Sequence, residues 1–442
     1  MELRALYLRY RFWLNDWFNG SPIGKHYRDV RYISEHSFNE VNHIREQKLR
    51  KLLSFAQGYS VFYKTYSGDR LSAYPVVNKT DLITHYNEIR VDVANIPEQR
   101  GSVHIQTTSG STGIPLAIPQ DTEKRYRRIA ELKYFGKVVG FDSHEMLIHL
   151  RTWNKWQSKT SAQIRRENII PFDISDMGDE RMCLLSELIR RYKAVCLRGY
   201  ASSFDIFSRY IQTHPVSFPS LRIIIAGSET LHENVRANVK KFLGCEIISQ
   251  YANEECGILA QERIPTLSKD NVMYLNHASY IFEFLKMDSD IPAGYGELAR
   301  IVVTDLSNRA FPLIRYDTGD VGVLMPPDEF SHGFPVLGKL YGRRLDICYT
   351  TEGSPFHPMA IGRIMKHFDG VKQWQFIQKD ECEYTLKVVM KETLPINYLQ
   401  PAVENLLGIV GRNAKISIEN VNEIPILASG KRKAVVNEWK KN

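Results

Sequence analysis

Hydrophobic positions follow two different patterns along the chain, and the pattern changes near residue 297. Between residues 122 and 249, segments with helical spacing alternate with short apolar runs rich in β-branched residues. The predicted helices are 122–140, the first part of 183–198, 203–213 and Val239–Phe242; the predicted strands are Ala194–Leu197, Leu221–Ala226 and Glu246–Ser249. This alternation predicts α/β layers around a largely parallel sheet.

Two helices and one capped segment are expected before residue 86. Residues 3–18 place leucine and aromatic side chains at helical spacing, with arginines mainly on the other face. Such a helix packs on its own domain or on a partner subunit, as in a homodimer, or lies on a membrane surface as a peripheral contact. A second helix is predicted over Phe38–Ala56. In residues 75–85 a short extended entry leads into a helix capped by Asn78 or Thr80.

From Glu297 onward, short strands with Gly, Pro and Asp turns predict an antiparallel or barrel-like region. Its expected strands are Leu298–Thr304, Val321–Met325 and Tyr341–Tyr349. The last hundred residues mix predicted strands and helices and are expected to form a separate α+β domain, with strands at Tyr384–Met390 and Lys415–Val421 and helices at Met359–His367 and Tyr398–Leu407. We place the boundary near Gly342, which gives domains 1–341 and 342–442.

Composition and charge limit the general class of protein but do not indicate a particular function. The chain has 442 residues and a net charge of +8, from 58 basic and 50 acidic side chains. Its basic pairs are scattered, and no basic stripe with interleaved aromatics predicts nucleic-acid binding. The six cysteines are far apart and without zinc-like spacing, as in reduced thiols of a cytoplasmic protein. No apolar run is long enough to span a bilayer, and the first residues do not resemble a signal peptide.

The segment Thr107–Pro119 carries the first candidate chemistry. Gly110 and Gly113 lie among five hydroxyl side chains, those of Thr107, Thr108, Ser109, Ser111 and Thr112. Successive backbone N–H groups in such a turn form a concave anion site, to which hydroxyls add donors. A polyphosphate fits this chemistry, and a Ser/Gly surface turn is the alternative. The segment is not a Walker A loop, because Ile114 stands where that motif requires lysine.

Further motifs follow in the sequence, and three of them also have a purely structural interpretation. They are Ala226–Leu231, Ser249–Gly257, Arg315–Asp320, Gly342–Asp346 and Ser429–Lys433. The first could be a strand-to-helix turn with Glu229 in the first helical turn, the third a plain turn, and the last a basic tail. Gly294–Ala299 fits a dinucleotide pattern but leads into a strand, where that fingerprint requires a helix.

Taken together, these motifs resemble the adenylate-forming superfamily, in its phenylacetate-CoA ligase and CapK-like branch. The segment Pro75–His85 is similar to an early segment of the same branch. The resemblance implies a large α/β N-terminal domain, with parallel-type sheets and a small barrel-like β region. It also implies a small mobile α+β C-terminal domain that carries a catalytic lysine.

The resemblance assigns roles residue by residue. Catalytic roles fall on Lys431, Glu255 and Thr108, and Glu255 is also the expected Mg²⁺ ligand. Tyr251 would stack on adenine, Asp320 would accept hydrogen bonds from the ribose, and Arg343 would reach the ribose or phosphate. The remaining nucleotide-binding assignments are Ser109, Gly110, Ser111, Thr112, Gly113, Gly227, Ser228 and Glu229.

The sequence departs from the family pattern at several positions. Ala252 replaces a glycine, and Glu254 replaces the hydroxyl residue that touches the α-phosphate. A carboxylate facing a phosphate is unfavourable unless a metal lies between them, so Glu254 either points away or joins Glu255 on Mg²⁺. Leu345 occupies the usual hinge-acid position, and Asp346 is the substitute.

The activity that the resemblance implies is AMP-forming ligation. ATP-Mg would activate a small carboxylic acid as an acyl-adenylate, and the acyl group would pass to coenzyme A. One alternative is amide or ester formation on a sugar or amino-acid acceptor in surface polysaccharide assembly, as associated with CapK-like relatives. Another alternative, motivated by Glu254, is a non-catalytic nucleotide-binding scaffold.

Overall fold

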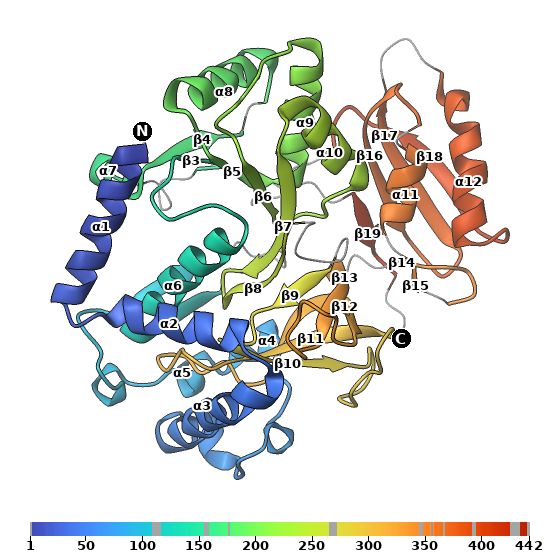
Figure 1. The fold of residues 1–442 in the computed structure, drawn as a ribbon. Helices are drawn as coiled ribbons and strands as arrows, with labels where there is room; N and C mark the ends of the chain where they lie inside the picture. The colour runs from blue at the N-terminus through green and yellow to red at the C-terminus, as the bar shows by residue number, and fades with distance from the viewer. Residues whose placement is uncertain are drawn as a thin grey trace. The chain divides into compact units, whose positions relative to one another are not determined.

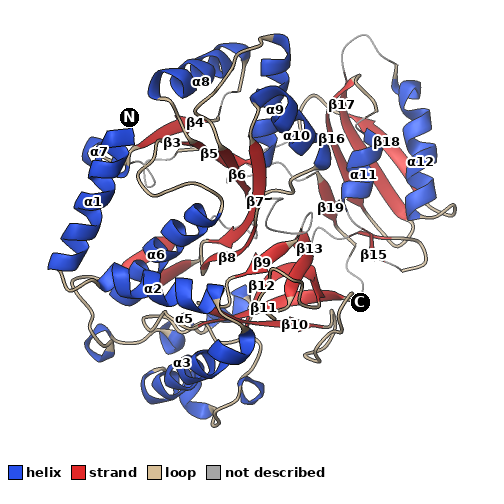
Figure 2. Cartoon of the chain, in the orientation of Figure 1, coloured by secondary structure: helices blue, strands red, loops and turns tan. Residues whose placement is uncertain are grey.

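The computed structural model describes residues 2–107, 116–153, 159–175, 177–264, 272–343, 348–353, 355–356, 358–365, 367–390, 395–424 and 434–439. These residues form two compact units. The first holds residues 2–107, 116–318 and 322–340, and the second holds residues from 341 onward together with 319–321. Figure 1 labels the elements, and Figure 2 shows how helices and strands alternate along the chain.

An eleven-stranded sheet runs through the first unit in the order β10-β11-β12-β13-β9-β8-β7-β6-β5-β3-β4. Its strands are β3 Leu147–Arg151, β4 Ile169–Asp173, β5 Cys196–Tyr200, β6 Ile223–Gly227, β7 Glu246–Asn253, β8 Gly257–Glu262, β9 Met273–Leu275, β10 Tyr280–Leu285, β11 Leu298–Asp305, β12 Tyr316–Met325 and β13 Val336–Arg343. Strands β4, β3, β5, β6 and β7 pair in parallel, which confirms the α/β prediction for this half.

The other half of the sheet contains antiparallel pairs: β7 with β8, β8 with β9, β9 with β13, and β10 with β11. The strand-rich region expected after Glu297 is therefore present, and it continues the same sheet. Strand β12 begins at Tyr316, five residues before the predicted start. The Arg315–Asp320 motif consequently lies largely within a strand, so the plain-turn interpretation is wrong.

Helices cover both faces of the parallel half (Figure 1). The helices of this unit are α1 Glu2–Phe18, α2 Pro22–Glu35, α3 Phe38–Tyr59, α4 Lys79–Thr84, α5 Tyr86–Ile89, α6 Thr122–Val138, α7 Ser161–Glu167, α8 Asp179–Tyr192, α9 Ala201–Thr213 and α10 Glu233–Asn238, which the π-helical turn η4 Val239–Leu243 extends. Apolar side chains of α8 and α9 pack with Leu150, Leu197 and Ile224 on one face. On the other face, Val139 just after α6 packs with Cys196 and Ile225.

Side chains at the helix starts explain several boundaries. Asn78 accepts hydrogen bonds from the backbone N–H groups of Thr80 and Asp81, so it is Asn78 that caps α4. Asp121 accepts from the Lys124 N–H at 2.7 Å and begins α6. Gly140, with φ of +80°, follows the end of α6, as the sequence predicts.

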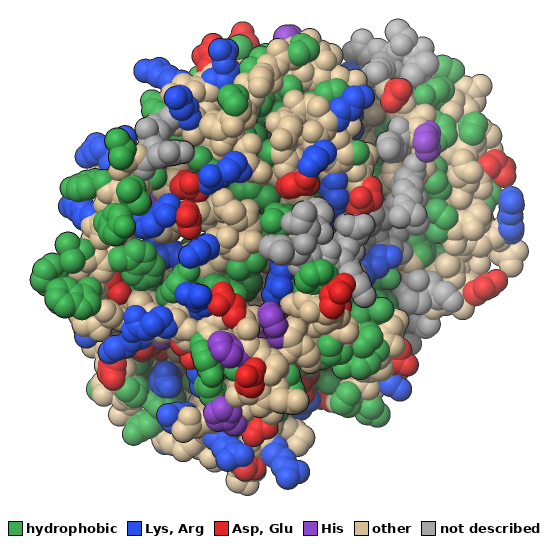
Figure 3. Space-filling model, in the orientation of Figure 1, with side chains coloured by type: hydrophobic (Ala, Val, Ile, Leu, Met, Phe, Trp, Pro, Cys, Tyr) green, Lys and Arg blue, Asp and Glu red, His purple; other side chains and the backbone are tan. Residues whose placement is uncertain are grey.

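Helix α1 packs with one face only. Ala5 and Asp16 are buried, and the Asp16 carboxylate accepts from the Ile23 and Gly24 N–H groups. The opposite face exposes large apolar side chains, seen at the left of Figure 3: Leu3, Leu6, Tyr7, Tyr10, Leu14, Trp17 and Phe18. Contact of this face with a membrane surface or a partner subunit stays a prediction. No helix among the described residues is long and apolar enough to cross a membrane.

The second unit has its own sheet and core. Four strands run in the order β18-β17-β16-β19, with β16 antiparallel to β17 and the outer pairs parallel. The elements are β14 Cys348–Tyr349, β15 Pro355–Phe356, α11 Pro358–Met365, β16 Val371–Gln378, β17 Glu383–Met390, α12 Gln400–Val410, β18 Lys415–Asn420 and β19 Val435–Asn437. Phe376, Leu386 and Leu406 are fully buried in its core, so this α+β unit has an independent hydrophobic centre.

Candidate functional site

Three segments that are far apart in the sequence meet in the first unit. Val77 forms a parallel bridge with Tyr316, since its N–H donates to the Arg315 carbonyl at 3.0 Å and its carbonyl accepts from the Asp317 N–H at 2.8 Å. The third segment is the turn between β7 and β8, which carries Glu255. Two of the motifs singled out in the sequence are thus brought together with the Pro75–His85 segment.

The turn after β7 is built by local hydrogen bonds. Asn253 pairs with Gly257 across the antiparallel β7–β8 connection. The Asn253 side-chain oxygen accepts from the Cys256 N–H at 2.8 Å. Gly257 has φ of +125°, a region that strongly favours glycine. This geometry places Glu255 in the turn with only 4% of its surface exposed.

Two side-chain hydrogen bonds join this turn to β12. The Tyr316 hydroxyl donates to Glu255 Oε1 at 3.4 Å, and the Tyr251 hydroxyl donates to Thr318 Oγ1 at 3.4 Å. Thr318 in turn donates to the Ile301 carbonyl at 2.9 Å. Since Tyr251 is 7% exposed, its ring is held largely within the core. The predicted adenine and metal residues are therefore fixed against the Arg315–Asp320 motif.

Ion pairs hold the start of β12 in place. Arg315 has φ of +51°, and its guanidinium contacts the Glu283 carboxylate at 3.0 Å and donates to the Tyr74 carbonyl at 2.8 Å. Asp317 pairs with Arg300 at 2.9 Å, and both side chains are mostly buried. The first four residues of this motif consequently act as a scaffold that orients the neighbouring turn.

Glu254 turns toward β1 His104–Thr107, which pairs with β2 Ala117–Gln120. Its carboxylate accepts from Gln106 Nε2 at 2.8 Å and lies 3.9 Å from Arg128 Nη2. Arg128 also donates to the Glu254 carbonyl at 3.2 Å. Gln106 and Arg128 therefore partly balance the Glu254 charge, and its direction relative to a phosphate stays a prediction.

The turn after β6 lies at the carboxyl end of the parallel strands, the edge where α/β proteins bind ligands. Ser228 has φ of +66°, and the Glu229 carboxylate accepts from the Ser202 N–H at 2.9 Å, near the start of α9. A side chain at Gly227 would stand 3.3 Å from the Gln250 carbonyl oxygen. Helix α10 begins only at Glu233, so the interpretation of Glu229 as part of a first helical turn is wrong.

Asp320 and Arg343 face one another. Arg343 Nε lies 3.4 Å from Asp320 Oδ1, where the Arg343 side chain is 39% exposed and that of Asp320 is 10% exposed. Gly319 has φ of +75°, and a side chain there would meet Arg343 Nη1 at 3.0 Å. A partly exposed pair of this kind contributes about 0–1 kcal/mol to stability. Both groups can therefore exchange this contact for a ligand at little cost.

Several predicted site residues lie outside the described residues. They are Thr108, Ser109, Gly110, Ser111, Thr112, Gly113, Leu345, Asp346 and Lys431. Residues 108–115 fall between β1 and β2, where Thr107 pairs with Ala117. The roles that the resemblance assigns to these residues remain predictions.

For a metal ion, Glu255 offers one buried carboxylate. The described residues contain no group of three or more His, Cys, Asp or Glu side chains that could hold an ion. Mg²⁺ is commonly bound by one or two carboxylates together with substrate phosphates and water. The donor set therefore fits a magnesium ion that arrives with a nucleotide, with Glu255 as its protein ligand.

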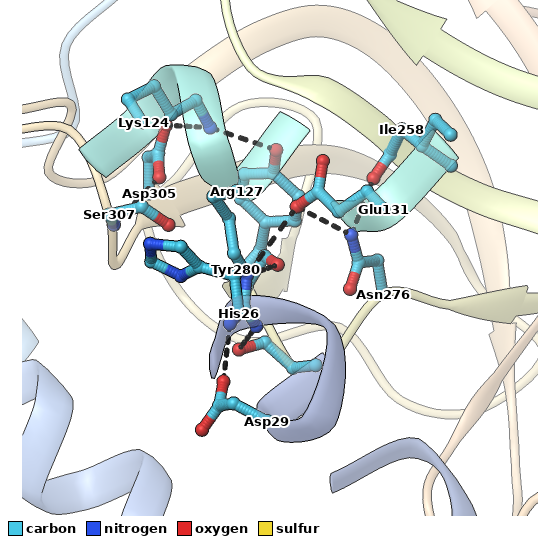
Figure 4. Close-up of polar contacts among 12 residues, drawn as sticks. His26, Asp29, Lys124, Arg127, Glu131, Ile258, Asn276, Tyr280, Asp305 and Ser307 are labelled. Carbon is cyan, nitrogen blue, oxygen red and sulfur yellow. Dashed lines mark hydrogen bonds and ion pairs between the residues drawn. The ribbon is translucent and has the colours of Figure 1, made fainter. Parts of the chain in front are cut away.

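A buried network of charged side chains packs against the β7–β8 turn that carries Glu255 (Figure 4). The sequence interpretation did not identify this network. Lys124 Nζ lies 2.5 Å from Asp305 Oδ2, with both side chains fully buried, and 3.1 Å from the Tyr280 hydroxyl. Tyr280 donates to the Cys256 carbonyl at 2.8 Å, next to Glu255. The signal in the sequence was weak, because a lysine on a helix is usually solvated.

Arg127 extends the network to a second helix. It is paired with Asp29 of α2 and donates to the Ser279 hydroxyl at 2.7 Å and to the Ala278 carbonyl at 2.6 Å. Glu131, one turn further along α6, accepts from Asn276 at 3.2 Å and lies 3.9 Å from Arg127. Although burial opposes it, the pairing with Arg127 and Lys48 lowers the pKa of Asp29.

Parts of this chain are similar to known proteins. A family model described as CapK C-terminal domain matches residues 348–438. Protein CapK of Staphylococcus aureus is 22% identical over 97% of this chain and 100% of its own length. The phenylacetate-coenzyme A ligase of Thermus thermophilus is 24% identical over 64% of this chain and 65% of its own length.

Solved structures show the same fold. A 2-hydroxyisobutyryl-CoA ligase in the postadenylation state, in complex with 2-HIB-AMP, superimposes with a TM-score of 0.70 and 16% identity over 90% of each chain. The anthranilate CoA ligase AuaEII, in complex with anthranoyl-AMP, superimposes with a TM-score of 0.55 and 15% identity over 74% of this chain and 64% of its own. The chain thus has the fold of AMP-forming CoA ligases and carries a match to the CapK C-terminal domain, and the motifs and these relatives support a place in the CapK-like branch of the adenylate-forming superfamily.

Proposed function

We propose that this protein is an AMP-forming ligase that activates a carboxylic acid with ATP and transfers the acyl group to coenzyme A. The observation that carries the proposal is the hydrogen-bonded junction of Tyr251 and Glu255 with Tyr316 and Thr318. Two motifs of one enzyme superfamily, Ser249–Gly257 and Arg315–Asp320, are joined there. The whole-chain similarity to relatives of this branch supports the same conclusion.

The proposed reaction has two steps. A carboxylate is a poor electrophile because its leaving group would be oxide, so its oxygen first attacks the α-phosphorus of ATP. Pyrophosphate leaves, and a mixed anhydride, the acyl-adenylate, is formed. The sulfur of coenzyme A then attacks the acyl carbon, AMP departs with its electron pair, and the thiol proton passes to solvent or base.

The residues divide these tasks in the proposal. Asp320 binds the ribose hydroxyls, Arg343 contacts the ribose or phosphate, and Tyr251 forms a wall of the adenine site. Glu255, oriented by Tyr316, would hold Mg²⁺, which neutralises phosphate charge when bound. Lys431 would offset the charge that develops at the α-phosphate. The Thr108–Gly113 loop would bind the remaining phosphate oxygens.

The C-terminal unit fits the role of a second, mobile domain in this scheme. It begins at Tyr341, next to the predicted boundary at Gly342, and has a core of its own. Rotation of this domain would carry Lys431 away after adenylation and expose the acceptor site.

A second candidate function is an AMP-forming amide or ester synthetase that uses a sugar or amino-acid acceptor. It is favoured by the similarity to Protein CapK along the full length of both chains. The two candidates share the first half-reaction and differ only in the acceptor. Release of AMP that depends on free coenzyme A would support the first, and release that needs an amine or a sugar would support the second.

The scaffold alternative loses part of its support. It rests on Glu254, a carboxylate at the position where the family pattern has a hydroxyl residue that touches the α-phosphate. In the structure this carboxylate accepts from Gln106 and lies near Arg128. The negative charge of Glu254 is therefore partly balanced, which weakens the argument against catalysis.

The test is ATP–pyrophosphate exchange with Mg²⁺ and a panel of aryl, fatty, hydroxy and amino acids. We expect exchange that depends on one class of acid and falls at least about 100-fold in Glu255→Gln and Lys431→Ala. Glu254→Gln is the matched control and should retain activity within about threefold, because it loses only a partly exposed pair. Exchange that is unaffected in Glu255→Gln would remove this residue from the mechanism. ATP binding without exchange for every acid would favour a scaffold.

A further inference from the structure

A cationic cluster lies on the α6-facing side of the parallel sheet, outside the junction described above. His149 of β3 and Arg198 of β5 are direct neighbours in the strand register. They alternate with Ile148, Leu150 and Leu197, which point to the opposite core, so both side chains project on the side where Cys196 and Ile225 lie. Each is the middle residue of its five-residue strand, two residues before the carboxyl end, which is the binding edge of α/β sheets.

Amide side chains fix the orientation of Arg198. The Arg198 guanidinium donates to Gln250 Oε1, and Gln250 Nε2 donates to Gln261 Oε1 at 2.5 Å. Gln261 Nε2 donates to the Phe135 carbonyl of α6 at 2.9 Å. The Phe135 carbonyl can only accept, so Gln261 must donate an amide N–H to it. The Gln261 amide oxygen then accepts from Gln250, which fixes the donor and acceptor at each step of this series of hydrogen bonds. The amide oxygen of Gln250 therefore faces Arg198, and the arginine is held at one nitrogen.

The described partners of Arg198 and His149 include no carboxylate. Among the described residues, Arg198 has the neutral Gln250 amide as its hydrogen-bond partner and forms no ion pair, although a guanidinium has five N–H donors. Arg151 follows His149 by two residues on the same side of β3. The Lys159 ammonium also lowers the pKa of His149, and it is paired with the Glu167 carboxylate at 2.7 Å.

The His149 ring is held by aromatic packing. Trp153 meets it edge to face at 5.4 Å, and the Trp153 indole N–H donates to the His149 carbonyl at 3.3 Å. The ring nitrogens of His149 make no hydrogen bond within the described part of the chain. Burial and the neighbouring Arg198 and Arg151 keep the pKa of His149 well below its usual range. A bound anion would relieve this electrostatic stress and accept hydrogen bonds from both side chains.

We propose that Arg198 and His149 bind a second, ionised carboxylate of the acid substrate, so that the preferred substrate class is dicarboxylic acids. This inference rests on the proposed ligase function and specifies its substrate. The position fits an acid that reacts beside the nucleotide, because Tyr200, two residues after Arg198, pairs with Gly227, a residue that the resemblance assigns to nucleotide binding. The reacting carboxylate would then be the one that is not held by Arg198.

The experiment compares matched acids that differ by one carboxylate, glutarate with pentanoate and isophthalate with benzoate, in ATP–pyrophosphate exchange. In the wild-type protein the dicarboxylate of a pair should be used at least about tenfold better. Arg198→Met should lower dicarboxylate use by about 10- to 100-fold, the range expected for a lost charged hydrogen bond. The monocarboxylate of the same pair should be unaffected or improved.

Three further variants sharpen the test. Arg198→Lys keeps the charge and loses the planar fork, so it should give an intermediate preference. His149→Gln should weaken dicarboxylate use less than Arg198→Met. Arg209→Met removes an arginine whose side chain is 63% exposed and pairs with Asp205, and it should behave like the wild type. A preference for monocarboxylates in the wild type, or an equal loss for both acids in Arg198→Met, would overturn the proposal.

A direct binding measurement tests the anion site independently of the ligase function. If no acid supports exchange, the ligase function fails, and thermal stabilisation by glutarate and isophthalate still tests the site. A melting-temperature increase in the wild type that is absent in Arg198→Met would support the anion site. An equal increase in both proteins, or none in either, would refute it.

Discussion

Two clusters of charged side chains in the first unit differ in the partners of their cations. Around α6, each buried cation of the network lies against a carboxylate: Lys124 contacts Asp305 at 2.5 Å, and Arg127 pairs with Asp29 and lies near Glu131. On the α6-facing side of the parallel sheet, Arg198 has a neutral amide partner and His149 has an aromatic one. Charges that only support the fold are neutralised within it, since an unpaired buried charge is costly. A cation left with a neutral partner is suited to an anion from outside.

The largest effect should come from breaking the paired cluster. Asp305→Asn leaves the fully buried Lys124 ammonium without its counter-charge, and loss of one member of such a pair costs about 3–5 kcal/mol. Urea unfolding measures this as a decrease in the free energy of unfolding. The double variant Lys124→Met with Asp305→Leu should recover most of the loss, because both charges are then removed. A cost below about 1 kcal/mol for Asp305→Asn would show that the pair is dispensable.

The next effect concerns a buried histidine outside both clusters. His277 stacks on Phe334 at 4.4 Å, and burial and the nearby Arg45 lower its pKa from 6.5 to about 3. Between these values the unfolded chain binds a proton that the folded chain excludes, so stability falls as the pH decreases from 6.5 toward 3. At pH 5 this difference amounts to about 2 kcal/mol.

His277→Phe tests this pH dependence while keeping an aromatic ring in the stack. The slope of unfolding free energy against pH, measured by urea unfolding from pH 7 to pH 5, should decrease by about one proton. Above pH 7 the slope should match that of the wild type. An unchanged slope below pH 6.5 would show that His277 titrates normally in the folded protein.

A smaller effect is expected from Arg198 of the cationic cluster. Arg198→Met should change the free energy of unfolding by no more than about 1 kcal/mol, since it removes one hydrogen bond and also the cost of desolvating a guanidinium. The measurement is urea unfolding without ligand, beside Asp305→Asn. A loss comparable to that of Asp305→Asn would place Arg198 among the residues that support the fold and would erase the contrast between the clusters.

The smallest effect should come from Glu254→Gln. The Glu254 side chain is 38% exposed and lies 3.9 Å from Arg128, so this pair contributes a few tenths of a kcal/mol to stability. The amide should keep a polar contact with Gln106. Thermal unfolding at low and at high salt should show nearly equal melting temperatures for variant and wild type. A large salt-dependent decrease would mean that Glu254 belongs with the paired network.

Much of the fold could be predicted from local patterns. The β-branched run at Leu221–Ala226 became β6, the apolar stripe of Phe38–Ala56 became α3, and Asn78 caps α4 as one of two predicted candidates. These features depend on periodicity and on backbone N–H groups within a few residues. The resemblance also selected Tyr251, Glu255 and Asp320, of which the first two meet the Arg315–Asp320 motif in space.

The sequence by itself therefore determined most element types, the order of the motifs and the resemblance to the superfamily, because each is encoded in short stretches of chain. Only the tertiary structure decided that Glu254 pairs with Arg128, that Lys124 is buried against Asp305, and that Arg198 and His149 are neighbours whose partners in the described part of the chain are an amide and an aromatic ring. Each of these contacts joins residues on different elements. A charged side chain has the same local sequence pattern whether it is solvated, neutralised by a partner or able to bind a ligand. Burial and the partner across the fold decide among these states, and both depend on how distant strands and helices pack.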